Sequence, residues 1–184
     1  MGRLMLGSLV AAVAMFLLGF LAYGSPLFSS AHVAIPAETQ LQVHEALKAL
    51  PASGTYFVPF ADGTDASLAA AHEAGPIATI SLTKPGGPPM DPTVMVKGFL
   101  HMLVSAFLLG LVLWSLRDRV TGFQERLRLV VAIAFATTIY FNIGQAVWWP
   151  GGWTFRSYVA VADFVMLVAA GAIIARWFLP QRAS

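Results

Sequence analysis

Four long apolar segments constrain this chain more than any other feature of its sequence. They run from Leu4 to Tyr23, from about Val94 to Leu116, from about Leu127 to Trp149 and from Ser157 to Leu179. At a helical rise of 1.5 Å per residue, each is close to the ~30 Å needed to cross the hydrocarbon core of a bilayer. Only helices can form such spans, because lipid offers no hydrogen-bond partner to backbone groups. We predict an all-α integral membrane protein with four transmembrane helices.

The composition agrees with a membrane location. Of the 184 residues, 58% are hydrophobic and 11% are charged, against about 25% charged residues in a typical soluble domain. The net charge of +2 gives no support to nucleic-acid binding. Because the sequence has no cysteine, it excludes disulfides, thiolate nucleophiles and cysteine-ligated metals.

The first apolar segment has a competing interpretation as a signal peptide. Ala22-Tyr23-Gly24 has the small-x-small pattern of a cleavage site. The apolar core is nevertheless longer than the ~7–15 residues usual for a signal peptide. We therefore expect residues 1–23 to form a transmembrane anchor helix and residues 94–184 a three-helix membrane bundle, with residues 24–93 inserted between them.

The charged residues predict the orientation of the spans. If four helices alternate, seven arginines and two acidic residues share one side, with a net charge of +5, whereas the other side carries four basic and six acidic residues. The positive-inside rule then places both termini in the cytoplasm and residues 24–93 on the extracytoplasmic side. The seven arginines are Arg3, Arg117, Arg119, Arg126, Arg128, Arg176 and Arg182.

The tryptophans support the same span ends. Each is expected near a membrane–water interface, where the amphipathic indole ring is favoured. This interfacial belt comprises Trp114, Trp148, Trp149, Trp153 and Trp177.

The segment 24–93 is predicted to be a small αβ insertion. Thr39 and Gln42 have the spacing of a capping box, and an amphipathic helix follows that ends before Pro51. Asp65 is placed to cap a second helix, which Gly75 ends. Two strands are expected, at Thr55–Phe60 and Ile77–Leu82, and the sequence leaves open how they pair. A stiff Pro/Gly hinge at residues 85–89 leads into the second span.

Polar side chains from three spans fall at a similar depth in the outer leaflet. His101 and Asn142 lie about 10 Å from the outer ends of their helices, Asp163 about 9 Å and Gln145 about 6 Å. Arg156, at the mouth of the fourth span, is placed to neutralise Asp163. An ionisable residue inside a span is a functional hypothesis by default. This intramembrane polar layer is therefore the candidate site.

Three interpretations of the polar layer remain open. Hydrogen bonding between helices, at ~0.6–2 kcal/mol per contact, is favoured. A proton path or small-molecule pocket is less favoured, because nothing ionisable lies at the midplane. His101 is also a possible axial ligand to haem or chlorin, although a b-type haem between helices normally takes two such ligands. The remaining histidines lack metal-site spacing, so we expect no metal and no cofactor, with haem or chlorin as the alternative.

Pairs of small residues at four-residue spacing occur in three spans. Such pairs let helices approach closely, within this chain or with another. They are Gly7 and Ala11, Ala106 and Gly110, and Gly171 and Ala175.

Three short motifs resemble an uncharacterised family of small bacterial inner-membrane proteins. The motifs are Gly54-Thr55-Tyr56-Phe57-Val58-Pro59, Gly75-Pro76-Ile77-Ala78 and Val159-Ala160-Val161-Ala162-Asp163. Members have one N-terminal span, a short outside region with a strand of this type and three further spans. The resemblance implies this topology and a bacterial inner membrane, and it implies no catalytic residue. Residues 60–68 depart from the family pattern.

No catalytic motif accompanies the spans: GxSxG, SxxK and HExxH do not occur. We therefore expect a non-enzymatic accessory, assembly or scaffolding subunit, with the lipid bilayer and other integral membrane subunits as partners. The alternative is a membrane protein that binds a cofactor or small molecule through the polar layer. A third hypothesis is an extracytoplasmic sensor, weakened by an inside loop of only about ten residues.

Overall fold

The computed structural model confirms four helices that are long and apolar enough to cross a membrane. It describes residues 1–149 and 151–180; Arg182, expected among the cytoplasmic arginines, lies outside them. The spans are α1 (Gly2–Gly24), α4 (Pro92–Ser115), α5 (Phe123–Thr138) with its continuation, and α7 (Trp153–Ile173) with its continuation. α5 continues through the π-helical turn η2 (Ile139–Ile143) into α6 (Gly144–Trp148), and α7 continues into the π-helical turn η3 (Ile174–Phe178).

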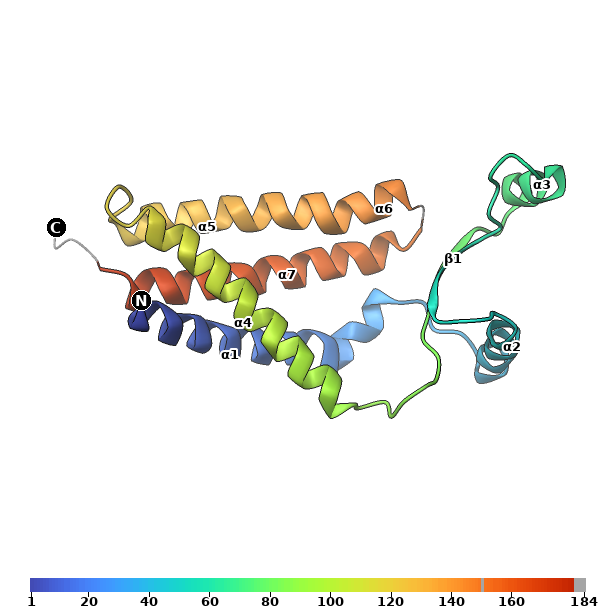
Figure 1. Ribbon diagram of the computed structural model, residues 1–184, viewed down its shortest axis with the longest axis horizontal. Helices are drawn as coiled ribbons and strands as arrows, with labels where there is room; N and C mark the ends of the chain where they lie inside the picture. Colours follow the sequence, from blue (N-terminus) through green and yellow to red (C-terminus); the bar gives the residue numbers. More distant parts are fainter. Residues whose placement is uncertain (150, 181–184) are drawn as a thin grey trace. The chain divides into compact units, whose positions relative to one another are not determined.

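The chain divides into two compact units. The first, the bundle, contains Met1–Val33 and Met90–Ser184, and the second, the insertion, contains Ala34–Pro89. α1 therefore belongs to the same unit as the three later spans. It packs against α4 and α7, while α5 packs mainly against α7. α4 crosses α1 obliquely (Figure 1).

Small side chains allow these close crossings. All six residues of the predicted small-residue pairs are buried in the bundle. A Cβ atom on Gly171 would lie 2.6 Å from Cγ2 of Val130, and one on Gly110 would lie 2.7 Å from Cδ1 of Leu4. A Cβ on Gly7 would lie 2.6 Å from Cγ of Phe178. The small residues thus allow close packing between helices of this chain.

A hydrogen bond joins two spans at each end of the bundle. At the terminal end, where α1 begins and η3 ends, Arg3 Nη2 donates to the Trp177 carbonyl at 3.5 Å. At the opposite, distal end, where α1 ends and α7 begins, the Tyr158 hydroxyl donates to the Ala22 carbonyl at 2.6 Å.

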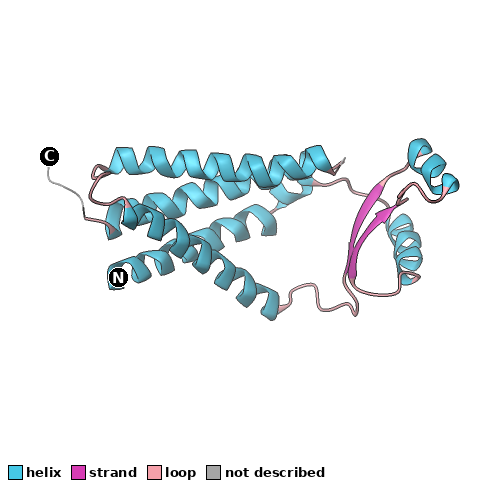
Figure 2. Cartoon of the chain, turned by 45° about the horizontal axis from the view of Figure 1, so that its top comes forward, coloured by secondary structure: helices cyan, strands magenta, loops and turns pink. Residues whose placement is uncertain are grey.

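The insertion contains α2 (Ala37–Lys48), β1 (Gly54–Val58), α3 (Ala66–Ala74) and β2 (Ala78–Leu82). The two strands pair antiparallel, with Tyr56 opposite Ile80, and α3 lies between them in the chain (Figure 2). The predicted αβ insertion is therefore only one small two-stranded sheet with two helices.

One helix boundary in the insertion differs from the prediction. α2 begins at Ala37, so Thr39 lies inside the helix and the expected capping box does not form. Pro36 occupies the N-cap position without a side-chain cap. The Gln40 amide donates instead to the Ile35 carbonyl at 3.0 Å.

The cap expected for α3 is confirmed. The Asp65 carboxylate accepts from the Ser67 backbone N–H at 2.8 Å and from the Ser67 hydroxyl at 2.6 Å. Hydrogen bonds hold the pKa of the Asp65 carboxyl below its usual value, and the bond from the Ser67 hydroxyl contributes more than those from backbone N–H groups. Gly75 ends the helix with a φ of +67°, a conformation that glycine adopts without steric cost.

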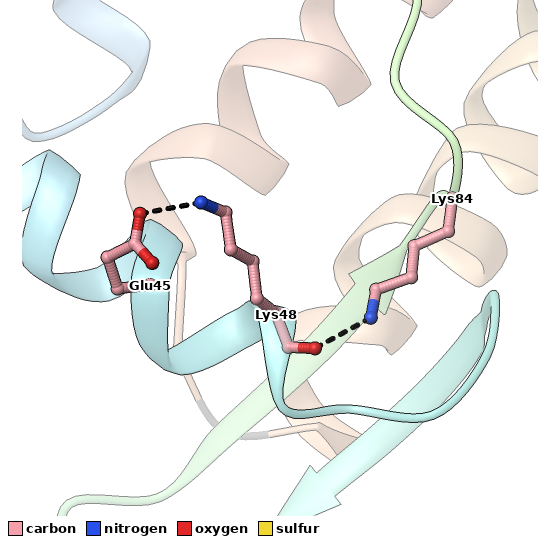
Figure 3. Close-up of polar contacts among 3 residues, drawn as sticks. All are labelled: Glu45, Lys48 and Lys84. Carbon is pink, nitrogen blue, oxygen red and sulfur yellow. Dashed lines mark hydrogen bonds and ion pairs between the residues drawn. The ribbon is translucent and has the colours of Figure 1, made fainter.

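Polar contacts join the end of α2 to the segment after β2. Lys84 Nζ donates to the Lys48 carbonyl at 2.9 Å and also to the Leu50 carbonyl. Figure 3 shows this contact beside the ion pair of Lys48 with Glu45, which joins two exposed side chains at 2.7 Å. A cation at a helix C-terminus offsets the negative end of the helix dipole. Of residues 34–89, all of which the structure describes, none is buried.

Candidate functional site

The centre of the candidate site is a hydrogen bond between two spans at the distal end. Asn142 Nδ2 donates to Asp163 Oδ2 at 2.9 Å, and both side chains are partly buried. The predicted meeting of polar side chains from the third and fourth spans therefore occurs for this pair. It ties η2 to α7.

The wide turn η2 carries Asn142 toward α7. Single π-helical turns inside α-helices are rare and frequently occur at functional sites. Within η2, Tyr140 and Phe141 remain exposed, while Asn142 is half-buried. The turn thus separates a side chain that bonds inside the bundle from two aromatic rings that face outward.

His101 adds an imidazole from α4 to the same region. Its side chain is exposed and lies within electrostatic range of Asp163. The Ser105 hydroxyl donates to its backbone carbonyl at 2.9 Å. The structure thus places His101 near the Asn142–Asp163 pair but gives its ring no hydrogen bond within the described residues.

Gln145 and Arg156 do not join this pair in the part of the chain that the structure describes. Gln145 is exposed on α6 and lines a separate surface hollow. The Arg156 guanidinium lies 5.8 Å from the centroid of the Phe155 ring, and no ion pair joins it to Asp163. The polar layer expected from depth is therefore split by the direction in which each side chain points.

Two tyrosines that sequence reasoning missed complete the distal end. Tyr23 lies within electrostatic range of Asp163, and its ring centroid is 6.2 Å from that of Tyr158. Phe28 packs against both, at 5.7 Å from Tyr23 and 6.1 Å from Tyr158. Their depth in the bundle could have identified them. Tyr158 lies within two turns of Asp163 on α7, and Tyr23 lies at the end of α1 that meets the start of α7.

A second polar feature, at the terminal end, was also missed. Arg126 was expected only as one of the cytoplasmic arginines, and its side chain is just 1% exposed. Its Nε donates to the Val120 carbonyl at 2.8 Å and its Nη2 to the Pro180 carbonyl at 2.7 Å. Nη1 is buried and has no partner among the described residues. Arg126 thus ties the α4–α5 connection to the segment that follows η3.

The tryptophans of the predicted interfacial belt lie near helix ends. Trp148 is 79% exposed, and Trp149, Trp153 and Trp177 are exposed as well. Trp114 is partly buried beneath Arg117, whose guanidinium carbon lies 4.5 Å from the centroid of the Trp114 ring. Four of the five rings are thus open to contact from outside the bundle.

The chemistry available at the distal end is hydrogen bonding and charge. Among the described residues, no group of three His, Asp or Glu side chains is arranged to hold a metal ion. His101 remains the residue that would ligate a haem or chlorin under the alternative hypothesis.

Comparisons with protein-family models, curated proteins and solved structures found no match for this chain. The resemblance to a family of small bacterial inner-membrane proteins therefore stays an expectation.

The Asn142–Asp163 bond is expected to contribute to folding stability. In a double-mutant cycle with Asn142→Ala and Asp163→Ala, we expect a coupling free energy of about 0.6–1.7 kcal/mol, the range of interhelical hydrogen bonds in membrane proteins. Unfolding of each purified variant in mixed micelles measures it. Asp163→Asn is the matched control, because its amide oxygen can still accept from Asn142. A coupling of zero would show that the bond is not energetically significant.

Proposed function

We propose that the protein is a non-catalytic accessory or scaffolding subunit that binds another membrane protein through one face of its third span. This aromatic face is formed by exposed side chains of η2 and α6. It comprises Tyr140, Phe141, Gln145, Val147 and Trp148.

The proposal depends on one observation, the surroundings of the Gln145 side chain. Its amide is exposed in a hollow of about 500 Å³ that apolar and aromatic side chains otherwise line. No hydrogen bond of this amide lies within residues 1–149 and 151–180. Hydrocarbon offers no partner to an amide, so a second helix that supplies one is favoured over lipid at this position. An amide with no partner among the described residues, on an otherwise apolar face, supports helix–helix association.

The small-residue pairs do not provide this interface. They are buried in seams between α1, α4, α5 and α7. A partner must therefore use a face that the bundle leaves open, and the aromatic face is one of these.

The proposal includes a location. The terminal end holds the described arginines of the basic side, so we propose that it faces the cytoplasm of a bacterial inner membrane. The insertion is then extracytoplasmic.

Site-specific photocrosslinking in the native membrane tests the proposal. A photoreactive amino acid at Phe141 is expected to crosslink to another membrane protein, whereas the same group at the exposed Leu17 of α1 is not. Gln145→Leu should lower the yield of this crosslink about fivefold, the effect of losing ~1 kcal/mol of hydrogen bonding.

Thr137→Val is the matched control for Gln145→Leu. The Thr137 hydroxyl already donates to the Ile133 carbonyl at 2.8 Å, so its removal should leave the crosslink unchanged. Crosslinks to lipid alone, with a lone monomer in several mild detergents, would contradict the proposal.

A further inference from the structure

We propose that the outer face of α5 binds an anionic phospholipid, with the phosphate at Arg128 and Gln124 and an acyl chain against the apolar residues that follow. This inference does not depend on the proposed function, because it concerns the terminal end of the third span and not the aromatic face. It rests on a surface hollow, on the cation that lines it and on the charge of the terminal end.

The hollow has a volume of about 370 Å³, and all the residues that line it belong to α5. Their spacing of three or four residues places them in one strip along the helix. Ala132 has the smallest side chain of the strip and lies between Arg128, one turn before it, and Phe135, about one turn after it. Its short side chain leaves room for a ligand between the two longer ones. The lining residues are Gln124, Leu127, Arg128, Val131, Ala132 and Phe135.

The strip is polar at the terminal end of the bundle and apolar beyond it. Gln124 and Arg128 are exposed in the first two turns of α5, whereas the strip is apolar from Val131 onward. From Arg128 to Phe135 the helix rises about 10 Å, which is within the ~15 Å of hydrocarbon in one leaflet. The Phe135 ring meets the Phe164 ring edge-on, with 6.2 Å between centroids. A polar group followed by a length of apolar surface matches the order of groups in a phospholipid.

The Arg128 side chain is available to a phosphate. It forms no ion pair and no hydrogen bond within residues 1–149 and 151–180. The carboxylate of Glu125, three residues before it, accepts from the Gly122 N–H at 3.4 Å. Side chains on a helix tilt toward its N-terminus, which carries the Arg128 guanidinium toward Gln124 and the membrane–water interface. A guanidinium presents its donors in a fork that fits phosphate oxygens, and the Gln124 amide adds a further donor.

The charge of the terminal end favours an anionic lipid over a zwitterionic one. Six described arginines lie there with two acidic residues, a net charge of +4. A basic residue near the membrane surface attracts anionic lipid by about fivefold per charge. A second copy of the chain in the same orientation would bring its own basic end against this one, which like-charge repulsion disfavours. A lipid with a net negative headgroup is thus the complement of the strip.

Lipid binding to the purified full chain tests the proposal. Native mass spectrometry in mild detergent would compare phosphatidylglycerol with phosphatidylcholine of the same acyl chains. We expect the intact chain to bind phosphatidylglycerol about fivefold more tightly. Arg128→Gln should remove most of this preference. Ala132→Trp, which fills the hollow from an exposed position, should weaken the binding of both lipids.

Arg119→Gln is the matched control, since it removes an exposed arginine from the same end that does not line the hollow. It should retain the preference, and the unfolding midpoint of each variant confirms that it is folded. Equal binding of the two lipids would overturn the proposal, and so would an equal loss of preference in Arg119→Gln and Arg128→Gln. Undiminished lipid binding by Ala132→Trp would also overturn it. Dimers of the chain that Ala132→Trp abolishes would assign the strip to a second copy instead.

Discussion

Replacing Gly171 with leucine is expected to lower the free energy of unfolding by about 3 kcal/mol, at the upper end of what overpacking costs. Gly171 is the point of closest approach between α7 and α5. Even a Cβ at this position would lie 2.6 Å from Cγ2 of Val130 and closer still to Cγ1. Val130 is fully buried, and both of its methyl groups face Gly171. The two helices must therefore separate, and contacts along their seam are lost.

Gly98→Leu is the control for this substitution. Gly98 lies inside α4, and a Cβ there would have no neighbour within 4 Å. The free energy of unfolding should therefore stay the same or rise slightly, because glycine is a poor helix former. Titration of the purified variants with denaturing detergent, followed by tryptophan fluorescence, measures both changes. Equal losses in the two variants would mean that the α5–α7 seam tolerates separation.

Arg126→Met is expected to cost about 2 kcal/mol of stability and to loosen the terminal end selectively. The substitution keeps an apolar stem but removes both hydrogen bonds, to Val120 and to Pro180. Hydrogen bonds from a charged donor contribute about 1.5–3 kcal/mol each. Part of that loss is offset, because the buried Nη1 no longer lacks a partner. Amide hydrogen exchange should accelerate near residues 117–122 and 174–180 and stay slow at the distal end.

Two further variants separate geometry from charge at Arg126. Arg128→Met removes an exposed guanidinium from the same helix and should change stability by less than about 0.5 kcal/mol. Arg126→Lys keeps the charge but has one nitrogen, which cannot hold the two carbonyls in the fixed fork of a guanidinium. Its stability should lie between the native chain and Arg126→Met. A loss in Arg128→Met as large as in Arg126→Met would indicate a general effect of charge.

The four spans could be predicted because segment length and the absence of charge determine membrane crossing almost alone. Their ends were less predictable. α4 begins at Pro92, two residues before the apolar run, because the Asp91 carboxylate accepts from the Thr93 N–H at 2.8 Å. Capping groups set such boundaries, whereas hydropathy follows only the apolar stretch.

The candidate site was predictable in depth but not in direction. Counting residues from a helix end, at 1.5 Å of rise per residue, places Asn142, Gln145 and Asp163 at similar depths. The direction of each side chain follows only if the helix keeps 3.6 residues per turn. The wide turn η2 breaks that assumption, and no sequence pattern announces it. Asn142 therefore reaches Asp163, while Gln145 faces away from it.

Arg126 shows a further limit of sequence reasoning. An arginine beside a membrane span is expected at the surface, because burying its charge is costly. Its burial depends on carbonyl oxygens contributed by Val120 and by Pro180, which is far away in sequence. The antiparallel pairing of β1 with β2 was undecided for the same reason, since local sequence does not determine long-range partners.

The insertion contributes little to the folding stability of the chain, because it has no buried core. Because no side chain of residues 34–89 is fully buried, its shape depends largely on peptide pairing, on turns and on the Lys84 contacts. Heating or mild denaturant should accordingly melt it as a separate, weakly cooperative transition ahead of the helices. A graft of another small domain between residues 33 and 90 is then expected to leave the transmembrane scaffold standing.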